Sequence, residues 1–212
     1  LEDPSLLECL KKVAYDQFYC EHIYVFSSIA LQKILNNYNL EIFDIENTST
    51  HGGSNRYFIK KKQNKRKINL SVKIQRKKEI KYGITKLSTY RKFARRVKSS
   101  RKKLKNMFIK LNSKNKKIIG YGATAKSTTI LNYCKINNNL ISYFVDTTKD
   151  KQNKYTPGTK IPIFKYSGLI EKNVDFIFLG AWNFKEEIFE KEKKFIKRGG
   201  KFIIHTPVPK II

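Results

Sequence analysis

The stretch Lys116–Lys126, which reads KKIIGYGATAK, decides the fold of this chain. Its two isoleucines lead into the turn Gly120–Gly122, and the small residues Ala123–Ala125 open an apolar-periodic segment that reaches Cys134. This order predicts a strand, a tight turn and a helix. Glycines let the backbone turn sharply and let a ligand approach closely, and the N–H groups that open a helix can hold phosphate oxygens.

An acid follows this turn in the way that is typical of nucleotide-binding units. The apolar run Ile141–Val145 ends at Asp146, about twenty residues after the turn, where a dinucleotide-binding unit carries an acid that accepts a hydrogen bond from a ribose hydroxyl. The third glycine position of such a motif, however, holds Ala125. A turn that needs its glycines only for backbone geometry, and that binds no ligand, is therefore the alternative.

Strands and helices alternate from this turn to the C-terminus. We expect strands at Lys117–Gly120, Ile141–Asp146, Asp175–Leu179 and Lys201–His205, and helices at Ala125–Lys135, Ser167–Glu171 and Glu186–Lys197. This alternation predicts an α/β fold with a Rossmann-like parallel sheet covered by helices. Ligands of such sheets lie beyond the carboxyl ends of the strands, where we expect the glycine turn, Asp146 and Ala181–Asn183.

A smaller α+β segment is expected to precede this sheet. Asp3 and Pro4 suit the N-cap and the first position of a helix. Further elements are a helix over Ser28–Tyr38, strands over Leu40–Ile45 and Tyr57–Ile59, and a charged loop or exposed edge over Lys60–Lys67. One apolar stripe at helical spacing predicts a long basic helix, with Leu87, Tyr90, Phe93, Val97, Leu104, Met107, Phe108 and Leu111. The predicted domains are 1–85, a connecting helix over 86–115, and 116–212.

Positive charge is concentrated in the middle of the chain. The formal net charge is +28, and Lys60–Lys117 holds 25 of the 45 basic residues with one acid, Glu79. One interpretation is a site for a polyanion such as nucleic acid. The other is a solvated helix face, because the bases lie mostly off the apolar stripe and are mostly lysines without interleaved aromatic residues.

Composition favours a globular chain with a sizeable core. Hydrophobic residues make up 40% of 212 residues, and no apolar run is long enough to span a bilayer. The three cysteines are scattered and form no metal-binding pair, and no signal peptide is visible. A cytoplasmic protein is therefore expected.

Two short polar clusters could carry chemistry. Tyr19, Glu21 and His22 lie among aromatic residues, and the spacing of Tyr19 and His22 would place both on one face of a helix. Histidine is the usual proton-transfer group at neutral pH, although a buried histidine with a backbone partner is the plainer interpretation. The loop Thr50–Arg56 could grip a phosphate or a sugar, or could simply connect a hairpin.

Taken together, these blocks resemble the C-terminal part of the S-adenosylmethionine-dependent sugar C-methyltransferases. The blocks that carry the resemblance, in the family's order, are YDQFYCEHIYVFS (15–27), THGGSNR (50–56), FARRV (93–97), IGYGATAK (119–126), DTTKDKQNKYTPGTKIPI (146–163) and GAWNFKEEI (180–188). These enzymes add a methyl branch at carbon 3 of nucleotide-linked 4-keto-deoxysugars. The resemblance covers nearly the whole chain.

The resemblance implies a catalytic base and a sugar-nucleotide site. His22 would be the general base that removes the proton next to the ketone, with Tyr19 and Glu21 orienting it or binding the sugar. Substrate-binding residues carried over from the matching blocks are His51, Gly52, Gly53, Ser54, Arg56, Gly120, Tyr121, Gly122, Ala123, Lys126, Asp146, Lys151, Pro157, Gly158, Trp182 and Asn183. The ligand implied is a nucleotide-sugar, most simply linked to thymidine diphosphate.

The same resemblance implies parts beyond this chain. The family has a zinc-binding N-terminal domain and a middle domain that binds S-adenosylmethionine, and we expect this chain to begin near the end of the latter. S-adenosylmethionine and zinc would then be bound elsewhere, and this fragment alone would be inactive. The alternatives are a non-catalytic nucleotide-sugar-binding fragment and a nucleic-acid-binding protein that uses residues 60–117. A nicotinamide-dependent oxidoreductase is disfavoured by the incomplete glycine motif.

Overall fold

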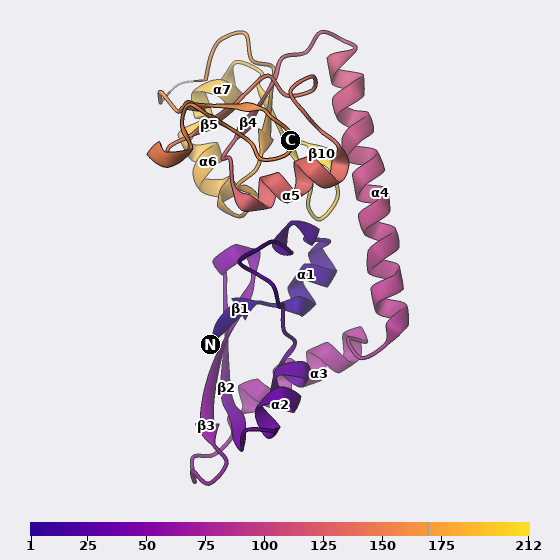
Figure 1. Ribbon diagram of the computed structural model, residues 1–212, viewed down its shortest axis with the longest axis vertical. Helices are drawn as coiled ribbons and strands as arrows, with labels where there is room; N and C mark the ends of the chain where they lie inside the picture. The colour runs from indigo at the N-terminus through magenta and orange to yellow at the C-terminus, as the bar shows by residue number, and fades with distance from the viewer. Residues whose placement is uncertain (169) are drawn as a thin grey trace. The chain divides into compact units, whose positions relative to one another are not determined.

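The computed structural model describes residues 1–168 and 170–212. The chain divides into two compact units, Leu1–Arg96 and Val97–Ile212, which we call the N-terminal unit and the C-terminal unit (Figure 1). The long helix α4 (Leu87–Asn112), predicted from its apolar stripe, begins in the first unit and ends in the second.

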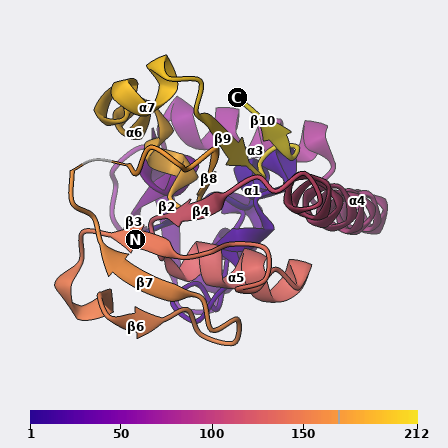
Figure 2. The same ribbon diagram turned by 90° about the horizontal axis from the view of Figure 1, so that it is seen from above.

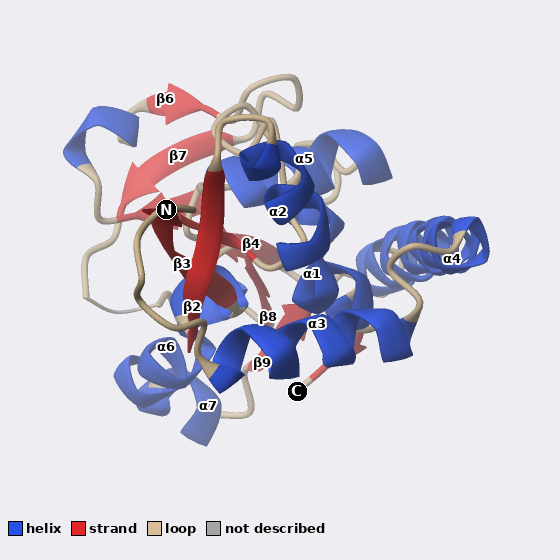
Figure 3. Ribbon diagram, turned by 90° about the horizontal axis from the view of Figure 1, so that it is seen from below, coloured by secondary structure: helices blue, strands red, loops and turns tan. Residues whose placement is uncertain are grey.

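A three-stranded antiparallel sheet with the order β1-β3-β2 organises the N-terminal unit. Its elements are β1 (Glu2–Pro4), α1 (Leu6–Lys12), the 3-10 helix η1 (Tyr15–Gln17), α2 (Ser28–Asn36), β2 (Leu40–Thr48), the 3-10 helix η2 (Thr50–Gly52), β3 (Ser54–Lys61) and α3 (Leu70–Tyr82). Helices α2 and α3 pack against β2 and against each other (Figure 3). Their common core contains Leu31, Leu35, Ile42, Ile45, Tyr57 and Val72.

The N-terminal residues form a strand where a helix start was predicted. Asp3 pairs with Asn55 of β3, and its Oδ2 accepts a hydrogen bond of 2.9 Å from the backbone N–H of Phe26. Helix α1 therefore starts at Leu6. The prediction was wrong because pairing with β3, distant in sequence, satisfies backbone groups that a local cap would otherwise serve. Lys60 and Lys61, predicted to lie in a loop or at an exposed edge, extend β3.

Helix α3 was not predicted because its buried face is mostly polar. Val72, Gln75 and Glu79 are the buried residues of this helix. Their spacing is helical, but only the valine is apolar, and hydrophobic periodicity does not detect such a face. The lysine and arginine residues of α3 lie largely on its exposed side.

Glu79 is buried because it caps another helix. Its carboxylate accepts hydrogen bonds from the Ser28 N–H at 2.9 Å, the Ser28 hydroxyl at 2.8 Å and the Ile29 N–H at 3.2 Å. The two N–H groups lie at the positive end of α2, where they have no partner within the helix itself. The single acid of the basic segment therefore joins α3 to the start of α2.

A seven-stranded sheet with the order β10-β9-β8-β4-β5-β7-β6 forms the C-terminal unit. The strands are β4 (Ile118–Tyr121), β5 (Phe144–Asp146), β6 (Lys154–Tyr155), β7 (Pro162–Lys165), β8 (Phe176–Leu179), β9 (Lys201–Ile204) and β10 (Lys210–Ile211). The five inner strands run parallel, and β6 and β10 pair antiparallel at the two edges. This is the predicted Rossmann-like α/β fold, although the inner strand β7 and the edge strands β6 and β10 were not predicted.

Helices cover both faces of this sheet. They are α5 (Ala125–Cys134), α6 (Lys185–Lys191) and α7 (Lys193–Lys197), with the 3-10 helices η3 (Lys149–Lys151) and η4 (Trp182–Phe184). Figure 2 shows α5 on one side and α6 with α7 on the other. The core under α6 and α7 contains Ile119, Tyr121, Ile177, Leu179, Ile188, Phe195 and Phe202, whose strand residues alternate as a pleat requires.

Two helix predictions need correction. The helix expected over Glu186–Lys197 is two helices that meet at Glu192, where the buried carboxylate accepts a hydrogen bond from the Tyr166 hydroxyl. The helix expected over Ser167–Glu171 includes residue 169, which lies outside the described residues, and its other four residues are not helical.

Candidate functional site

A tight turn holds the predicted catalytic residues of the N-terminal unit. The backbone N–H of His22 donates to the Tyr19 carbonyl at 2.9 Å, and the two rings lie 4.4 Å apart between centroids. We expected a helix face to bring these side chains together, but residues 19–22 form a turn. The side chains of Tyr19 and His22 therefore lie together as expected, but a turn and not a helix brings them there.

The orientation of the His22 ring is set by one backbone carbonyl. Nδ1 of His22 lies 3.1 Å from the carbonyl oxygen of Gln17. Because a carbonyl can only accept, this contact requires a proton on Nδ1. In the neutral ring the lone pair is then on Nε2, which is the arrangement that a general base needs.

The predicted loop residue His51 lies beside His22. The two rings stand nearly perpendicular, with centroids 4.9 Å apart. The side-chain N–H of Gln17 donates to the His51 carbonyl at 2.5 Å, and Gln17 is only 1% exposed. Gln17 therefore positions both histidines, one through its backbone and one through its side chain. Sequence reasoning missed this role, because nothing in the local pattern distinguishes Gln17 from an ordinary polar residue.

The loop that carries His51 has an unusual backbone. Three consecutive residues, His51, Gly52 and Gly53, have positive φ angles of 55°, 83° and 135°. The last value is open almost only to glycine, and a Cβ at Gly53 would lie 3.1 Å from the Glu8 side chain. The glycine pair thus allows the chain to turn back and place His51 at the turn.

Tyr19 and Glu21 form a hydrogen-bonded pair next to His22. Burial, then the charge of Glu21 and a hydrogen bond with its carboxylate, raise the pKa of the Tyr19 phenol above its ordinary value. The phenol therefore remains a proton donor at neutral pH. Burial raises the pKa of the Asp3 carboxyl group, against the hydrogen bond from the Phe26 N–H and the charge of His22.

Two other predicted residues of this loop point to different partners. Arg56 forms ion pairs of 2.9 Å with Glu2 and 3.0 Å with Glu46 on an exposed face of the sheet. The hydroxyl of buried Ser54 donates to the Thr50 carbonyl at 3.0 Å. Both residues stabilise the hairpin and the loop through these contacts.

In the C-terminal unit, Asp146 fixes the glycine turn. Its Oδ2 accepts from the Ala123 N–H at 2.8 Å, and its Oδ1 accepts from the Thr148 N–H at 2.8 Å. Lys151 adds a longer ion pair of 3.7 Å. Asp146 is buried and each of its oxygens already accepts one backbone N–H, so its first role in this structure is to hold the turn. Ribose binding by Asp146 stays a prediction.

A pocket of about 290 Å³ lies beyond the carboxyl ends of β4 and β5. Of the predicted residues, Ala123, Lys151 and Pro157 line it. Helix α5 begins here, with the Thr124 side chain accepting from the Ser127 N–H at 3.0 Å as the N-cap. Additional lining residues are Ala125, Thr128, Asp150, Lys154, Tyr155, Thr156 and Ile163, which sequence reasoning did not single out. Apolar walls with a helix start and lysines suit a nucleotide.

The remaining predicted residues lie around this turn but do not line the pocket. Gly122 has a φ of 79°, and a Cβ there would lie 3.0 Å from Ala181. Lys126 is buried, with its ammonium 5.8 Å from the centre of the Trp182 ring. The other residues are Gly120 in β4 against Phe144, Tyr121 at the end of β4, Gly158 against Asn132, and Asn183 in η4.

Tyr121 belongs to a buried network behind the turn. Burial and then the charge of Glu192 raise the pKa of Tyr121 to about 12. Its ring lies 5.3 Å from that of Tyr166, whose hydroxyl donates to Glu192. This network packs the sheet against α6 and α7 and leaves Tyr121 as a neutral phenol.

Neither a metal-binding cluster nor a membrane-spanning helix occurs in residues 1–168 and 170–212. Within these ranges no three histidine, cysteine, aspartate or glutamate residues gather as a metal would require. None of the helices in the same ranges combines the length and the apolar character needed to cross a membrane.

Comparison with known proteins identifies the family. The chain is 32% identical over 212 residues to C-methyltransferase NovU of Streptomyces niveus, and this match covers 100% of the chain and 50% of NovU. The chain thus spans half the length of this curated relative. Residues 49–209 match the family described as C-methyltransferase C-terminal domain. Because this match covers more than half of the chain, the chain belongs to the C-methyltransferase C-terminal domain family.

Proposed function

We propose that this chain is the part of a sugar C-methyltransferase that holds a nucleotide-linked 4-keto-deoxysugar and supplies the catalytic base. The observation that carries the proposal is the contact of 3.1 Å between Nδ1 of His22 and the Gln17 carbonyl. It leaves Nε2 of the neutral ring as a proton acceptor in a half-buried turn.

The proposed chemistry begins with removal of a proton from the carbon next to the ketone. Nε2 of His22 takes this proton, and the electron pair of the C–H bond spreads onto the ketone oxygen as an enolate. The enolate carbon is then the nucleophile that accepts a methyl group. We assign S-adenosylmethionine, the expected methyl donor, and the expected zinc ion to no residue of this chain.

Tyr19 and His51 suit the stabilisation of the enolate. The Tyr19 phenol remains protonated at neutral pH, because burial and Glu21 raise its pKa. A neutral donor next to the base can hydrogen-bond the oxygen on which negative charge develops. In the structure Glu21 accepts the single phenol proton of Tyr19, so this donor would turn from Glu21 to the enolate oxygen when the sugar binds. The His51 ring, perpendicular to His22, would limit how the sugar enters.

The pocket of about 290 Å³ in the C-terminal unit is our candidate for the nucleotide. Lys151 and Lys154 can neutralise phosphate charge, and the start of α5 offers backbone N–H groups. Thymidine diphosphate is the nucleotide that we propose. We also propose a cytoplasmic location, in which the thiols of the three cysteines remain reduced.

Proton exchange tests the base without a methyl donor. The chain is incubated in D₂O with a nucleoside diphosphate-4-keto-6-deoxysugar, and loss of the signal of the C3 protons is followed by NMR. We expect the chain to accelerate exchange, and His22→Gln to slow it by about 100-fold. Cys20→Ser, at an exposed neighbouring position, is the control and should exchange at the wild-type rate.

Two results would contradict the proposal. Unchanged exchange in His22→Gln would remove this histidine from the mechanism. Binding of the nucleotide-sugar without any accelerated exchange would favour the non-catalytic fragment that we expected as the alternative.

A further inference from the structure

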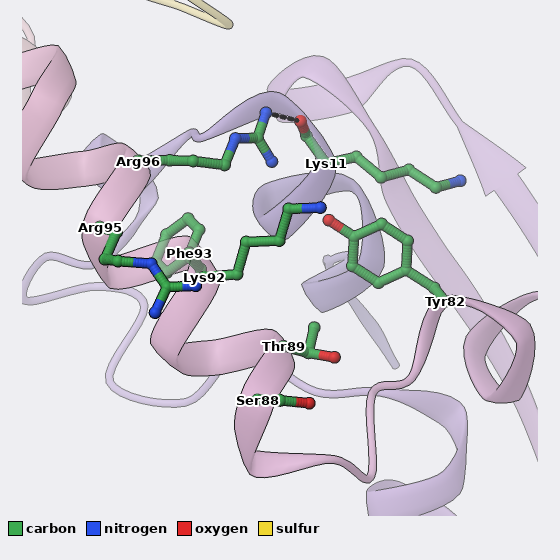
Figure 4. A pocket seen from close by; sticks show the side chains of 8 residues that line it. All are labelled: Lys11, Tyr82, Ser88, Thr89, Lys92, Phe93, Arg95 and Arg96. Atoms are coloured by element: carbon green, nitrogen blue, oxygen red, sulfur yellow. Dashed lines mark hydrogen bonds between the residues drawn. The ribbon is translucent and has the colours of Figure 1, made fainter.

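The N-terminal unit contains a basic pocket that the proposed catalytic turn does not use. It has a volume of about 670 Å³ and lies where the first turns of α4 face α1 and the end of α3 (Figure 4). Four of its lining residues are bases, namely Lys11, Lys92, Arg95 and Arg96. Such a concentration of positive charge in a concave site favours an anionic ligand.

The four bases have different partners. The Arg96 guanidinium donates to the carbonyls of Leu10 at 3.1 Å and Lys11 at 2.9 Å, which fixes it at the end of α1. Lys11 has a weak exposed pair with Glu8 at 3.4 Å. No ion pair joins Lys92 or Arg95 to an acid anywhere in residues 1–168 and 170–212. Two of the bases are therefore free to bind an external anion.

Hydroxyl groups add neutral donors to the same wall. Ser88 and Thr89 lie in the first turn of α4, one helical turn before Lys92 and Phe93. Figure 4 shows the Lys92 ammonium pointing toward the Tyr82 hydroxyl across the pocket. The Thr89 hydroxyl already donates its proton to the Gly83 carbonyl at 2.8 Å. The Ser88 hydroxyl, the Tyr82 phenol and the positive end of the α4 dipole are the donors that remain for the oxygens of a ligand.

The pocket shares a wall with the catalytic turn. Phe93, which lines the pocket, packs edge-on against Phe18, with ring centroids 6.4 Å apart. Phe18 directly precedes Tyr19 in the chain. A ligand in the pocket would thus lie against Phe93, whose ring separates it from the residue next to the proposed site of proton transfer.

We propose that this pocket binds the diphosphate group of a small phosphorylated ligand. Two free bases and one fixed guanidinium match a group with several negative charges, and the hydroxyls match its many acceptor oxygens. If the proposed function holds, the nucleotide-sugar is one source of this group, and its diphosphate would then lie here and not at Lys151 and Lys154. A separate phosphorylated small molecule is the other source, and both have the same chemistry.

Calorimetric titration of the 212-residue chain with inorganic pyrophosphate tests the pocket. The test variant Lys92→Gln/Arg95→Gln removes the two free bases. The control variant Arg91→Gln/Lys98→Gln removes one arginine and one lysine from exposed positions of the same helix that do not line the pocket. We expect the test variant to bind at least tenfold more weakly and the control variant to lose less than twofold, with unchanged urea unfolding for both.

An equal loss of pyrophosphate affinity in the two double variants would contradict the proposed binding site, because the binding would then follow net charge alone. The proposal would also be contradicted if a random DNA duplex bound more tightly than pyrophosphate, with an affinity that falls steeply as salt rises.

A titration with thymidine diphosphate distinguishes the two sources, and either outcome supports the pocket. If its affinity falls in Lys92→Gln/Arg95→Gln, the diphosphate is that of the nucleotide. If the affinity for thymidine diphosphate falls only in Lys151→Gln, while the affinity for pyrophosphate still falls in Lys92→Gln/Arg95→Gln, a separate ligand occupies the pocket. Neither result depends on His22, so failure of the proposed chemistry remains distinguishable.

Discussion

At the scale of single residues, the proposed site depends on buried polar groups with specific partners. Gln17 holds the ring of His22 through its backbone and the loop of His51 through its side chain. Buried hydrogen bonds of this kind restrict side chains to one orientation, because breaking them leaves an unsatisfied polar group. Glu21 is exposed, and it accepts a hydrogen bond from the half-buried Tyr19 phenol.

Asp3 is a residue at which the charged state opposes stability. Burial raises the pKa of its carboxyl group, against a hydrogen bond from Phe26 and the charge of His22. A carboxyl whose pKa is raised by folding contributes stability below its unfolded pKa and loses that contribution as pH rises through the folded pKa. At neutral pH the ionised form therefore opposes folding.

We accordingly expect Asp3→Asn to stabilise the chain at pH 7. The amide oxygen can still accept from the Phe26 N–H, and the cost of a buried charge disappears. Urea unfolding at pH 7 and at pH 3 measures the effect, which should vanish at pH 3, where Asp3 is protonated in both states. A gain of equal size at both pH values would contradict this explanation.

At the scale of elements, helix α3 and the start of α2 depend on one carboxylate. Glu79 is 0% exposed and accepts four hydrogen bonds, three from residues 28 and 29 and one of 3.1 Å from Gln75. Hydrogen bonds to a charged group contribute more than neutral ones, and their loss leaves buried donors unpaired.

Glu79→Ala should therefore lower the free energy of unfolding by about 3 kcal/mol. Urea unfolding measures the change, and Glu46→Ala is the matched control, because Glu46 is an exposed acid of the same unit. The control should change the free energy by less than about 0.5 kcal/mol. Equal effects of the two substitutions would refute the capping role of Glu79.

At the scale of the whole molecule, α4 contributes to two separate cores. Tyr90 and Phe93 pack against Leu7, Leu10 and Ile84 in the N-terminal unit. Leu104 and Phe108 are fully buried in the C-terminal unit, where the Phe108 ring lies 5.7 Å from that of Phe178. The second half of the helix thus covers a face of the parallel sheet.

We expect residues 97–212 to fold alone and residues 116–212 to fold poorly. The shorter fragment lacks Leu104 and Phe108, so Phe178 and its neighbours become exposed, and losing such large buried side chains costs about 3–5 kcal/mol each. Thermal unfolding followed by circular dichroism compares the two fragments. A cooperative transition of the same midpoint in both would contradict this role of α4.

Much of the fold could be predicted from the sequence, and the reasons are local. Apolar runs that end at glycines predicted β4 and β8 within about two residues. Apolar periodicity predicted α5 after the glycine turn, and the regular stripe predicted α4. The family resemblance likewise rested on short blocks read in order. Tyr19, His22 and His51 were recognised as candidate site residues in this way.

The tertiary structure alone decided which groups meet. Pairing of β1 with β3 replaced the predicted helix start, and α3 was missed because its buried face carries Gln75 and Glu79. Gln17 gained its role only because the chain returns at His51, 34 residues later. Local patterns report the hydrophobicity and backbone preference of neighbouring residues, whereas hydrogen bonds between distant segments depend on how the whole chain packs.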